Sequence, residues 1–90
     1  MSQSIIKEKT FKFALEIIKI SKLLLQKNEF VLSKQLLRAG TSIGANIREA
    51  LNAESTADFI HKFSIAQKEC DETLYWIELL MESMKASTVA

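Results

Sequence analysis

The chain has 90 residues, which is enough for one small domain, and 48% of them are hydrophobic. Two glycines and no proline argue against a fold rich in sheets and turns, and a single cysteine excludes an intrachain disulfide and a cysteine-based metal site. The net charge of +1 does not by itself indicate a nucleic-acid binder, and neither a signal peptide nor an apolar run of the roughly 18 residues that span a membrane is visible, so we expect a cytoplasmic protein.

The first predicted helix spans residues 4–27 and carries an unusually wide apolar face. At about 100° per residue, its apolar side chains cover an arc of roughly 220°. They form two seams, one of Phe13, Ile17, Ile20 and Leu24 and the other of Phe11, Leu15, Ile18 and Leu25. An arc of this width must be covered from two sides. We therefore expect the helix to contact another subunit or a further helix as well as its neighbour in the bundle.

The second predicted helix spans residues 33–52. Asn28 is a suitable left-handed cap for the end of the first helix, and Ser33 is a suitable N-cap for the second. Its apolar face is a seam of residues at alternating spacings of four and three: Leu36, Gly40, Ile43, Ile47 and Ala50, with Gly44 alongside. In a helix interior each of the two glycines costs about 1 kcal/mol relative to alanine. We interpret both as positions where a neighbouring helix approaches closely. The alternative is a ligand site at the exposed backbone, although no strand precedes the glycines to form a phosphate loop.

Asn46 lies at the margin of the same apolar face. Left unpaired there, its side chain would cost about 1–3 kcal/mol. We predict that it bonds to a backbone group or to a polar side chain of the third helix, and that it fixes the register or the oligomeric state of the bundle.

The third predicted helix spans residues 56–84 and begins at a clear cap. Ser55 and Asp58 form a Ser-x-x-Asp pattern that resembles a capping box. Beyond it, small or apolar residues follow one another at alternating spacings of four and three: Phe59, Phe63, Ala66, Cys70, Thr73, Ile77, Leu80 and Met84. Residues 85–90 lack this pattern, and we expect them to fray. Together the three patterns predict an all-α protein, an up-and-down antiparallel bundle in a single domain of residues 1–90.

No catalytic or metal-binding constellation is visible. His61 and Cys70 are nine residues apart, which places them about 180° apart on a helix, so they cannot share a metal or act as a catalytic pair. We expect His61 in solvent and Cys70 in the core. The acids of the third helix lack the inward Glu-x-x-His pairs of carboxylate-bridged metal sites. We therefore predict a non-enzymatic protein with no catalytic residue, no metal and no cofactor.

The charges are divided unevenly along the chain. Residues 1–48 hold nine Lys or Arg against three Asp or Glu, a balance of +6, whereas residues 49–90 hold three against eight, a balance of −5. Three interpretations stay open: charge matching within the chain, head-to-tail matching between subunits, or a basic face for an anionic partner.

For the third interpretation, the candidate nucleic-acid-binding residues are those on the polar sides of the first two helices: Lys12, Lys19, Lys27, Lys34, Arg38 and Arg48. Such a surface binds phosphates without reading bases, and repetition around a ring would raise its potential. An ordinary solvated lysine face is the alternative. No aromatic residue alternates with these bases, so a stacking platform for single strands is not expected.

Two runs of the sequence, LSKQLLRAGTSIGANIREA and DFIHKFSIAQKECDETLYWIELL, resemble the four-helix bundle family of 23S rRNA intervening-sequence proteins. The resemblance extends from about Phe11 to Leu80. Its most specific positions are Arg38, Thr41-Ser42-Ile43, Ala45-Asn46-Ile47, Glu49, Asp58-Phe59, Glu72-Thr73 and Tyr75-Trp76. The structural signature residues of the chain are Gly40, Gly44, Asn46, Glu49, Ser55 and Asp58.

This resemblance implies a bacterial protein that assembles as a ring-shaped homopentamer and has no catalytic activity. Some members are encoded within intervening sequences of 23S rRNA genes, and related bundle proteins bind nucleic acid through a basic surface. The family pattern continues into a fourth, C-terminal helix, whereas this sequence predicts three helices, so the fourth is absent or truncated and a different association becomes possible. The expected function is binding of ribosomal RNA or another nucleic acid by an oligomer. The alternative is a scaffold or adaptor that acts through protein–protein contacts.

Overall fold

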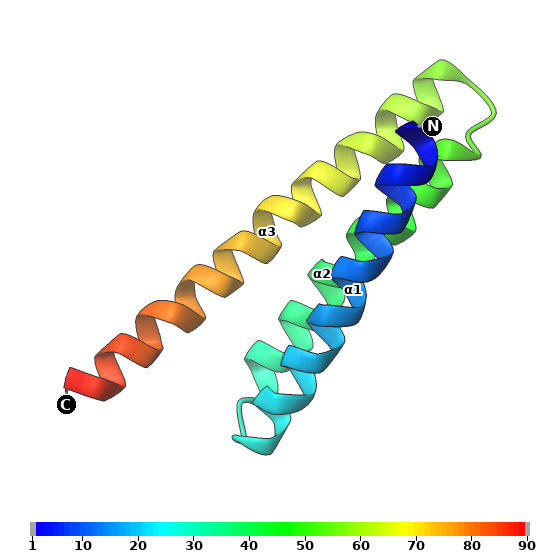
Figure 1. Ribbon diagram of the computed structural model, residues 1–90. Helices are drawn as coiled ribbons and strands as arrows, with labels where there is room; N and C mark the ends of the chain where they lie inside the picture. Colours follow the sequence, from blue (N-terminus) through cyan, green and yellow to red (C-terminus); the bar gives the residue numbers. More distant parts are fainter. Residues whose placement is uncertain (1, 90) are drawn as a thin grey trace.

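Three α-helices joined by two short turns form the structure, a computed structural model that describes the backbone of residues 2–89 and the side chains of residues 5–85. The helices are α1 (Ser2–Gln26), α2 (Phe30–Leu51) and α3 (Thr56–Val89) (Figure 1). No strand occurs within residues 2–89. The described part of the chain is therefore all-α, as predicted, with α2 antiparallel to its neighbours.

The helix α2 is the central element of the fold. It packs against both α1 and α3, whereas no Cα atom of α1 lies within 8 Å of a Cα atom of α3 among the described residues. Figure 1 shows the C-terminal half of α3 diverging from the α1–α2 hairpin. One side of the fold, between α1 and α3, consequently has no helix of the described chain against it.

The core is small and centred on α2. Its buried cluster is Ile17, Leu24 and Leu36, against which half-buried side chains from all three helices pack: Ile20, Leu32, Trp76, Ile77 and Leu80. The predicted seam of α2 is buried along its whole length: Leu36, Gly40, Ile43, Ile47 and Ala50. The spacing of four and three that predicted this packed face is confirmed.

The two glycines of α2 differ in how closely α1 approaches them. A Cβ atom at Gly40 would lie 2.7 Å from Cγ1 and 2.8 Å from Cγ2 of Ile17, so no side chain fits there without displacing Ile17. At Gly44 the nearest atoms would be the carbonyl oxygen and Oγ1 of Thr10, both at an ordinary 3.4 Å. The predicted reason for both glycines, close approach of a neighbouring helix, is confirmed at Gly40. At Gly44 the neighbouring atoms of α1 leave enough space for a methyl group.

The turn between α1 and α2 is only partly as predicted. Asn28 has φ 63°, so its left-handed cap conformation is confirmed. The prediction that Ser33 caps α2 is wrong, because α2 begins at Phe30 with Glu29 at the N-cap and no side-chain cap bond. Ser33 is instead a buried residue of the α1–α2 interface. Its Oγ donates to the carbonyl oxygen of Ser21 at 2.8 Å, and Ser21 Oγ donates to the carbonyl oxygen of Ser33 at 3.3 Å.

This reciprocal pair leads to a stability prediction. Replacing Ser33 by alanine is expected to lower the free energy of unfolding by about 1 kcal/mol, because a buried interhelical hydrogen bond is lost. Urea denaturation followed by circular dichroism measures the change. Ser64→Ala, at an exposed serine of α3, is the control and should stay within about 0.5 kcal/mol of the parent. An unchanged or increased stability of Ser33→Ala would contradict the role assigned to the pair.

The start of α3 follows the prediction and its end does not. Ser55 Oγ accepts the backbone N–H of Asp58 at 3.0 Å, which confirms the serine cap. The helix continues to Val89, five residues beyond the predicted end at residue 84, and fraying of its last turns stays a prediction. No proline or glycine interrupts the last turns. Residue 90 lies outside the described residues.

Asn46 finds its partner in its own helix. Its Nδ2 donates to the carbonyl oxygen of Ser42 at 2.9 Å. The prediction of a backbone partner is confirmed, whereas the predicted role in register or oligomeric state stays a prediction.

His61 is exposed, as predicted, but the prediction of a buried Cys70 is wrong because its thiol is exposed as well. The 4-3 pattern places Cys70 correctly on the apolar face of α3. That part of the face is exposed, and no Cα atom of α1 lies within 8 Å of a Cα atom of α3 among the described residues.

Candidate functional site

The two lysines predicted on the middle of α1 are engaged within their own helix. Lys12 Nζ lies 2.8 Å from Glu8 Oε1, and Lys19 Nζ lies 3.3 Å from Glu16 Oε1. The hydrogen bond from Lys12 lowers the pKa of Glu8 below its ordinary value and raises the pKa of Lys12. All four side chains are well exposed, so these pairs add little stability. They do reduce the net charge that the middle of α1 offers to an anion.

The two predicted arginines are also held by neighbouring helices. The Arg48 guanidinium lies over the ring of Phe11 of α1, with its Cζ 5.5 Å from the ring centroid. Arg38 forms ion pairs with two carboxylates of α3, with Nη1 at 3.2 Å from Glu69 and Nη2 in contact with Glu72. The structure thus places Arg38 in an acidic surrounding and not on a free basic face.

The contacts of Arg38 belong to a polar cluster that joins α2 to α3. Ser42 Oγ donates to Glu69 Oε2 at 2.9 Å, and the indole Nε1 of Trp76 donates to Glu72 Oε2 at 3.0 Å. Arg38, Ser42, Glu72 and Trp76 are four of the positions that carried the sequence resemblance. Their shared role in this structure is to dock α3 on α2.

A second ion pair joins the same two helices nearer to their turn. Lys62 Nζ lies 2.7 Å from Glu49 Oε1. The hydrogen bond to Glu49 raises the pKa of Lys62. Charge matching within the chain, one of the three interpretations of the uneven charge, therefore holds for the α2–α3 interface.

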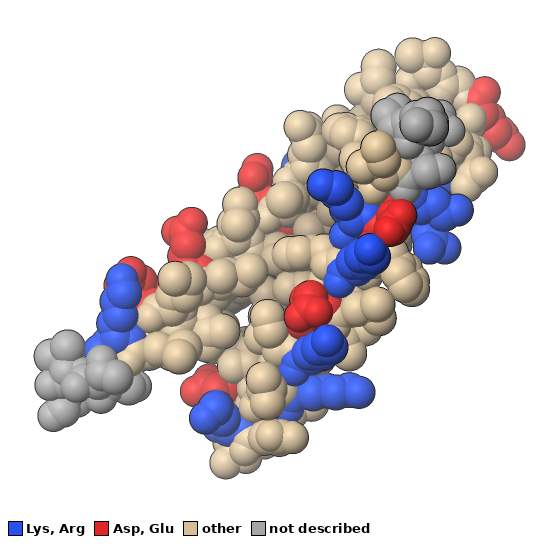
Figure 2. Space-filling model, viewed as in Figure 1, with Lys and Arg blue, Asp and Glu red and all other residues tan. Residues whose placement is uncertain are grey.

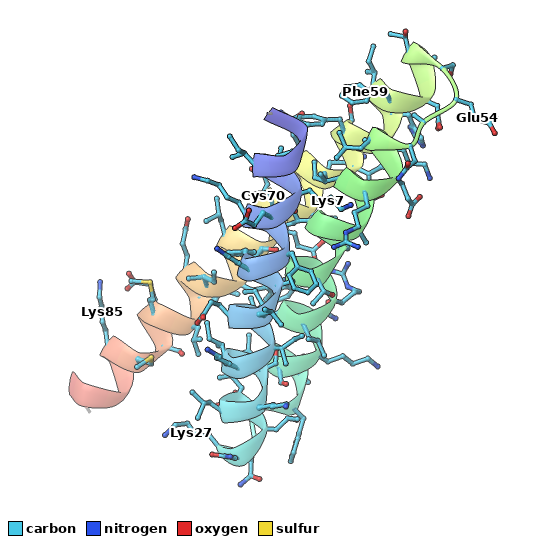
Figure 3. All side chains as sticks on the ribbon, turned by 45° about the vertical axis from the view of Figure 1, so that its right-hand side comes forward. Lys7, Lys27, Glu54, Phe59, Cys70 and Lys85 are labelled. Carbon is cyan, nitrogen blue, oxygen red and sulfur yellow. The ribbon has the colours of Figure 1, made fainter. Side chains whose placement is uncertain are left out.

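Two of the predicted lysines form no ion pair with a described carboxylate, and they lie at the end of the α1–α2 hairpin that holds the turn. Lys27 follows α1 and Lys34 lies in α2, and both are exposed with no carboxylate partner among residues 5–85. Lys22, in the last turns of α1, shares these properties. Figure 3 shows Lys27 at this end, and in Figure 2 the basic side chains lie mainly over the hairpin with a few carboxylates between them.

An exposed aromatic side chain accompanies these lysines. Phe30, the first residue of α2, is 60% exposed and lies between Lys27 and Lys34 in the sequence. We call the set of Lys22, Lys27, Phe30 and Lys34 the hairpin tip. Sequence reasoning missed Phe30 because it assigned residues 28–32 to a turn. An aromatic residue in a short turn flanked by two lysines was the available signal.

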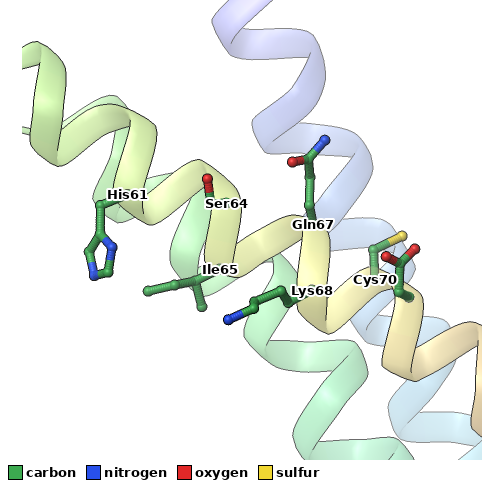
Figure 4. A pocket seen from close by; sticks show the side chains of 7 residues that line it. His61, Ser64, Ile65, Gln67, Lys68 and Cys70 are labelled. Carbon is green, nitrogen blue, oxygen red and sulfur yellow. The ribbon is translucent and has the colours of Figure 1, made fainter.

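The depressions found on the described surface are shallow and open to solvent. A shallow depression is lined by side chains of α3 alone: His61, Ser64, Ile65, Gln67, Lys68, Cys70 and Asp71 (Figure 4). No three His, Cys, Asp or Glu side chains converge as a metal site among the described residues. No helix of the described chain is long and apolar enough to cross a membrane.

These features define the class of the protein as an all-helical bundle whose conspicuous polar cluster joins two of its own helices. The family model for the 23S rRNA-intervening sequence protein matches residues 2–88. The chain therefore belongs to the 23S rRNA-intervening sequence protein family, and the resemblance inferred from its sequence is confirmed.

A solved structure supports the same assignment. The chain is similar to the crystal structure of a protein with unknown function from the S23 ribosomal protein family of Bacteroides thetaiotaomicron VPI-5482. The sequences are 52% identical, the TM-score is 0.88, and the match covers 92% of this chain and 75% of that chain. No curated protein matches the chain.

Proposed function

We propose that this protein is a non-enzymatic, self-associating member of its family that binds RNA or DNA through the hairpin tip. The observation that carries this proposal is the grouping of Lys22, Lys27 and Lys34 at one end of the hairpin without carboxylate partners among the described residues. The family name, which refers to 23S rRNA, favours RNA as the nucleic acid. Cytoplasmic location and a pentameric ring stay expectations from the resemblance.

The chemistry of the tip suits a phosphate backbone. Each lysine that neutralises a phosphate releases condensed counterions, which drives association without reading bases. Phe30, 60% exposed, offers a ring on which an unpaired base can stack. Glu29 is the one acid in this segment. The tip therefore favours single-stranded or looped segments over a regular duplex.

A charge-reversal experiment tests the tip. Lys27→Glu combined with Lys34→Glu is expected to weaken binding of a labelled single-stranded RNA about tenfold and to lower the salt slope by about 1.4, because two phosphate contacts are lost. Fluorescence anisotropy from low to physiological salt measures both quantities. A DNA strand of the same sequence and a ribosomal RNA fragment are the comparison ligands.

The control carries the same change in net charge on another helix. Lys68→Glu combined with Lys85→Glu alters α3 only, and it should weaken binding much less than the tip variant. Equal weakening by both variants would show a general charge effect and contradict the tip as the site. Binding that is absent, or that does not respond to salt, would exclude the electrostatic proposal altogether.

A scaffold or adaptor role is the second candidate, and one observation favours it. Four of the six basic residues predicted to bind nucleic acid, Lys12, Lys19, Arg38 and Arg48, lie in ion pairs or a cation–π contact within the chain. If this candidate is correct, RNA and DNA will not bind the parent protein, whereas high salt will change its oligomeric state.

A further inference from the structure

Two adjacent rows of apolar side chains are exposed on the outer side of the α1–α2 hairpin. We call them the outer hairpin face; at spacings of seven residues they are Phe11, Ile18 and Leu25 in α1, and Phe30 and Leu37 in α2. Ile18 is half-buried, and the other four side chains are between 38% and 60% exposed. The two rows lie on the same side of the hairpin, because Arg48 contacts the ring of Phe11 and shares its face of α2 with Leu37, eleven residues earlier.

The outer hairpin face has a basic border. Lys22 and Lys34 lie beside it on the helical wheel, and both are exposed with no carboxylate partner among residues 5–85. The two acids of α1, Glu8 and Glu16, are already paired with lysines of the same helix. Complementarity therefore calls for a partner whose apolar side chains are bordered by acids.

The chain itself carries a face of this kind on the outer side of α3. Five exposed residues share it, at the spacing of a helical stripe and opposite the buried Thr73: Asp71, Tyr75, Glu78, Leu79 and Glu82. We call them the outer α3 face. Asp71 and Glu78 have no ion-pair partner among the described residues. A second copy of the chain thus offers the apolar surface with an acidic border that the outer hairpin face lacks.

The two faces lie on opposite sides of the fold and near the same level along its length. The flank of α2 that holds α3 is a different one, since it carries Arg38 and Glu49. Because Arg38 contacts Glu72, the residues one turn further toward the α1–α2 turn, Lys34 in α2 and the segment before Glu78 in α3, lie near one level. Figure 1 shows the C-terminal half of α3 at the same end of the fold as this turn.

A rotation about an axis parallel to the helices keeps each residue at its level. It therefore brings the outer α3 face of one copy against the outer hairpin face of the next. We propose that a second copy of this chain docks in this way, with Glu78 of one copy beside Lys22 and Lys34 of the other and Tyr75 beside Leu37. The inference rests on the self-association in the proposed function.

This interface joins two different surfaces, so it is a head-to-tail contact. Contacts of this type close into a ring when the rotation divides a full turn, which agrees with the ring that the sequence resemblance implies. Both faces point away from the side of the fold between α1 and α3. A further helix packed on that side would leave both of them exposed.

Single-cysteine variants provide the first test. Cys70→Ser removes the native thiol, and Leu37→Cys or Tyr75→Cys then adds one thiol at a position that is 38% or 55% exposed. Under mild oxidation a mixture of the two variants should form disulfide-linked pairs about tenfold faster than either variant alone, because the contact raises their effective concentration. Phe13→Cys, 39% exposed on the other flank of α1, replaces Leu37→Cys in the control mixture and should give no acceleration.

The mixture distinguishes the head-to-tail contact from other associations. A two-fold contact of like faces would let one variant cross-link with itself. Such self-linking, or a mixture no faster than its components or than the control, would overturn the proposal. Circular dichroism verifies that each variant remains folded.

A charge exchange provides the second test. Lys34→Glu and Glu78→Lys should each weaken the association several-fold in sedimentation velocity from micromolar to millimolar concentration, and combining them in one chain should restore it. Glu54→Lys makes the same change in charge in the turn between α2 and α3, at the other end of the fold, and should have no effect. A monomeric parent, no restoration by the combined variant or equal weakening by Glu54→Lys would overturn the proposal.

The interface and the RNA site can fail separately. Lys34 belongs to both, so RNA and a docked copy should weaken each other's binding. The combined variant of Lys34→Glu and Glu78→Lys should regain association while its RNA binding stays weakened. Cross-linking by a protein that binds no RNA would remove only the proposed function, and RNA binding without cross-linking would remove only the proposed interface.

Discussion

Gly40→Ala is expected to lower the free energy of unfolding by about 1–3 kcal/mol, even though alanine is the better helix former. The new Cβ would lie 2.7 Å from Cγ1 of Ile17, and Ile17 is itself 1% exposed, so displacing it disturbs the core. Overpacking of this kind in a close-packed interior costs more than the gain in helix propensity, which is about 1 kcal/mol. Urea denaturation followed by circular dichroism measures the loss.

Gly44→Ala is the matched control, because it is the same substitution one turn further along the same helix. Its Cβ would meet Thr10 at an ordinary contact distance of 3.4 Å, so this variant should be as stable as the parent or more stable by up to about 1 kcal/mol. If both alanine variants were destabilised equally, the closeness of the α1–α2 contact at Gly40 would not be the reason for its glycine.

Arg38→Met should lower the free energy of unfolding by about 2 kcal/mol, chiefly by loosening α3 from α2. Methionine keeps an apolar stem of similar length but leaves Glu69, whose side chain is 19% exposed, and Glu72 close together without their shared cation. Trp76 is the single tryptophan and donates to Glu72, so its fluorescence reports on this interface directly.

A double-mutant cycle separates this network from an ordinary surface ion pair. Glu72→Gln should cost less in the Arg38→Met background than in the parent, because the two side chains act together. Lys62→Met removes the neighbouring pair with Glu49 and should cost about 0.5 kcal/mol. Additive effects of Arg38→Met and Glu72→Gln would contradict a shared network.

Much of the fold could be predicted from local sequence, because local rules decide it. The 4-3 spacing located the buried face of α2, and Asn28 and Ser55 were recognised by the chemistry of helix caps. The start of α2 was missed because Ser33 resembles an N-cap, whereas no residue between Phe30 and Ser33 breaks the helix. The exposure of Cys70 was missed for a different reason, since periodicity identifies an apolar face but not whether another helix covers it.

The sequence allowed us to predict which residue types form the candidate site, but not which side chains pair with one another. A helical wheel places Arg38 on the polar side of α2, but it cannot place Glu69 and Glu72, which are 31 and 34 residues away, beside its guanidinium. The same limit applies to Phe11 beneath Arg48. The lysines of the hairpin tip differ from the other predicted basic residues in having no such partner, and the sequence alone does not show that difference.

The central position of α2 has a consequence for how the chain folds. Within residues 2–89, helix packing joins only helices that follow each other in the sequence, and the connections between them are a few residues long. Loop closure therefore costs little entropy, and the relative contact order is low for a protein of this size. Each interface can form as a helical hairpin from two neighbouring segments of the chain. The topology therefore predicts rapid folding.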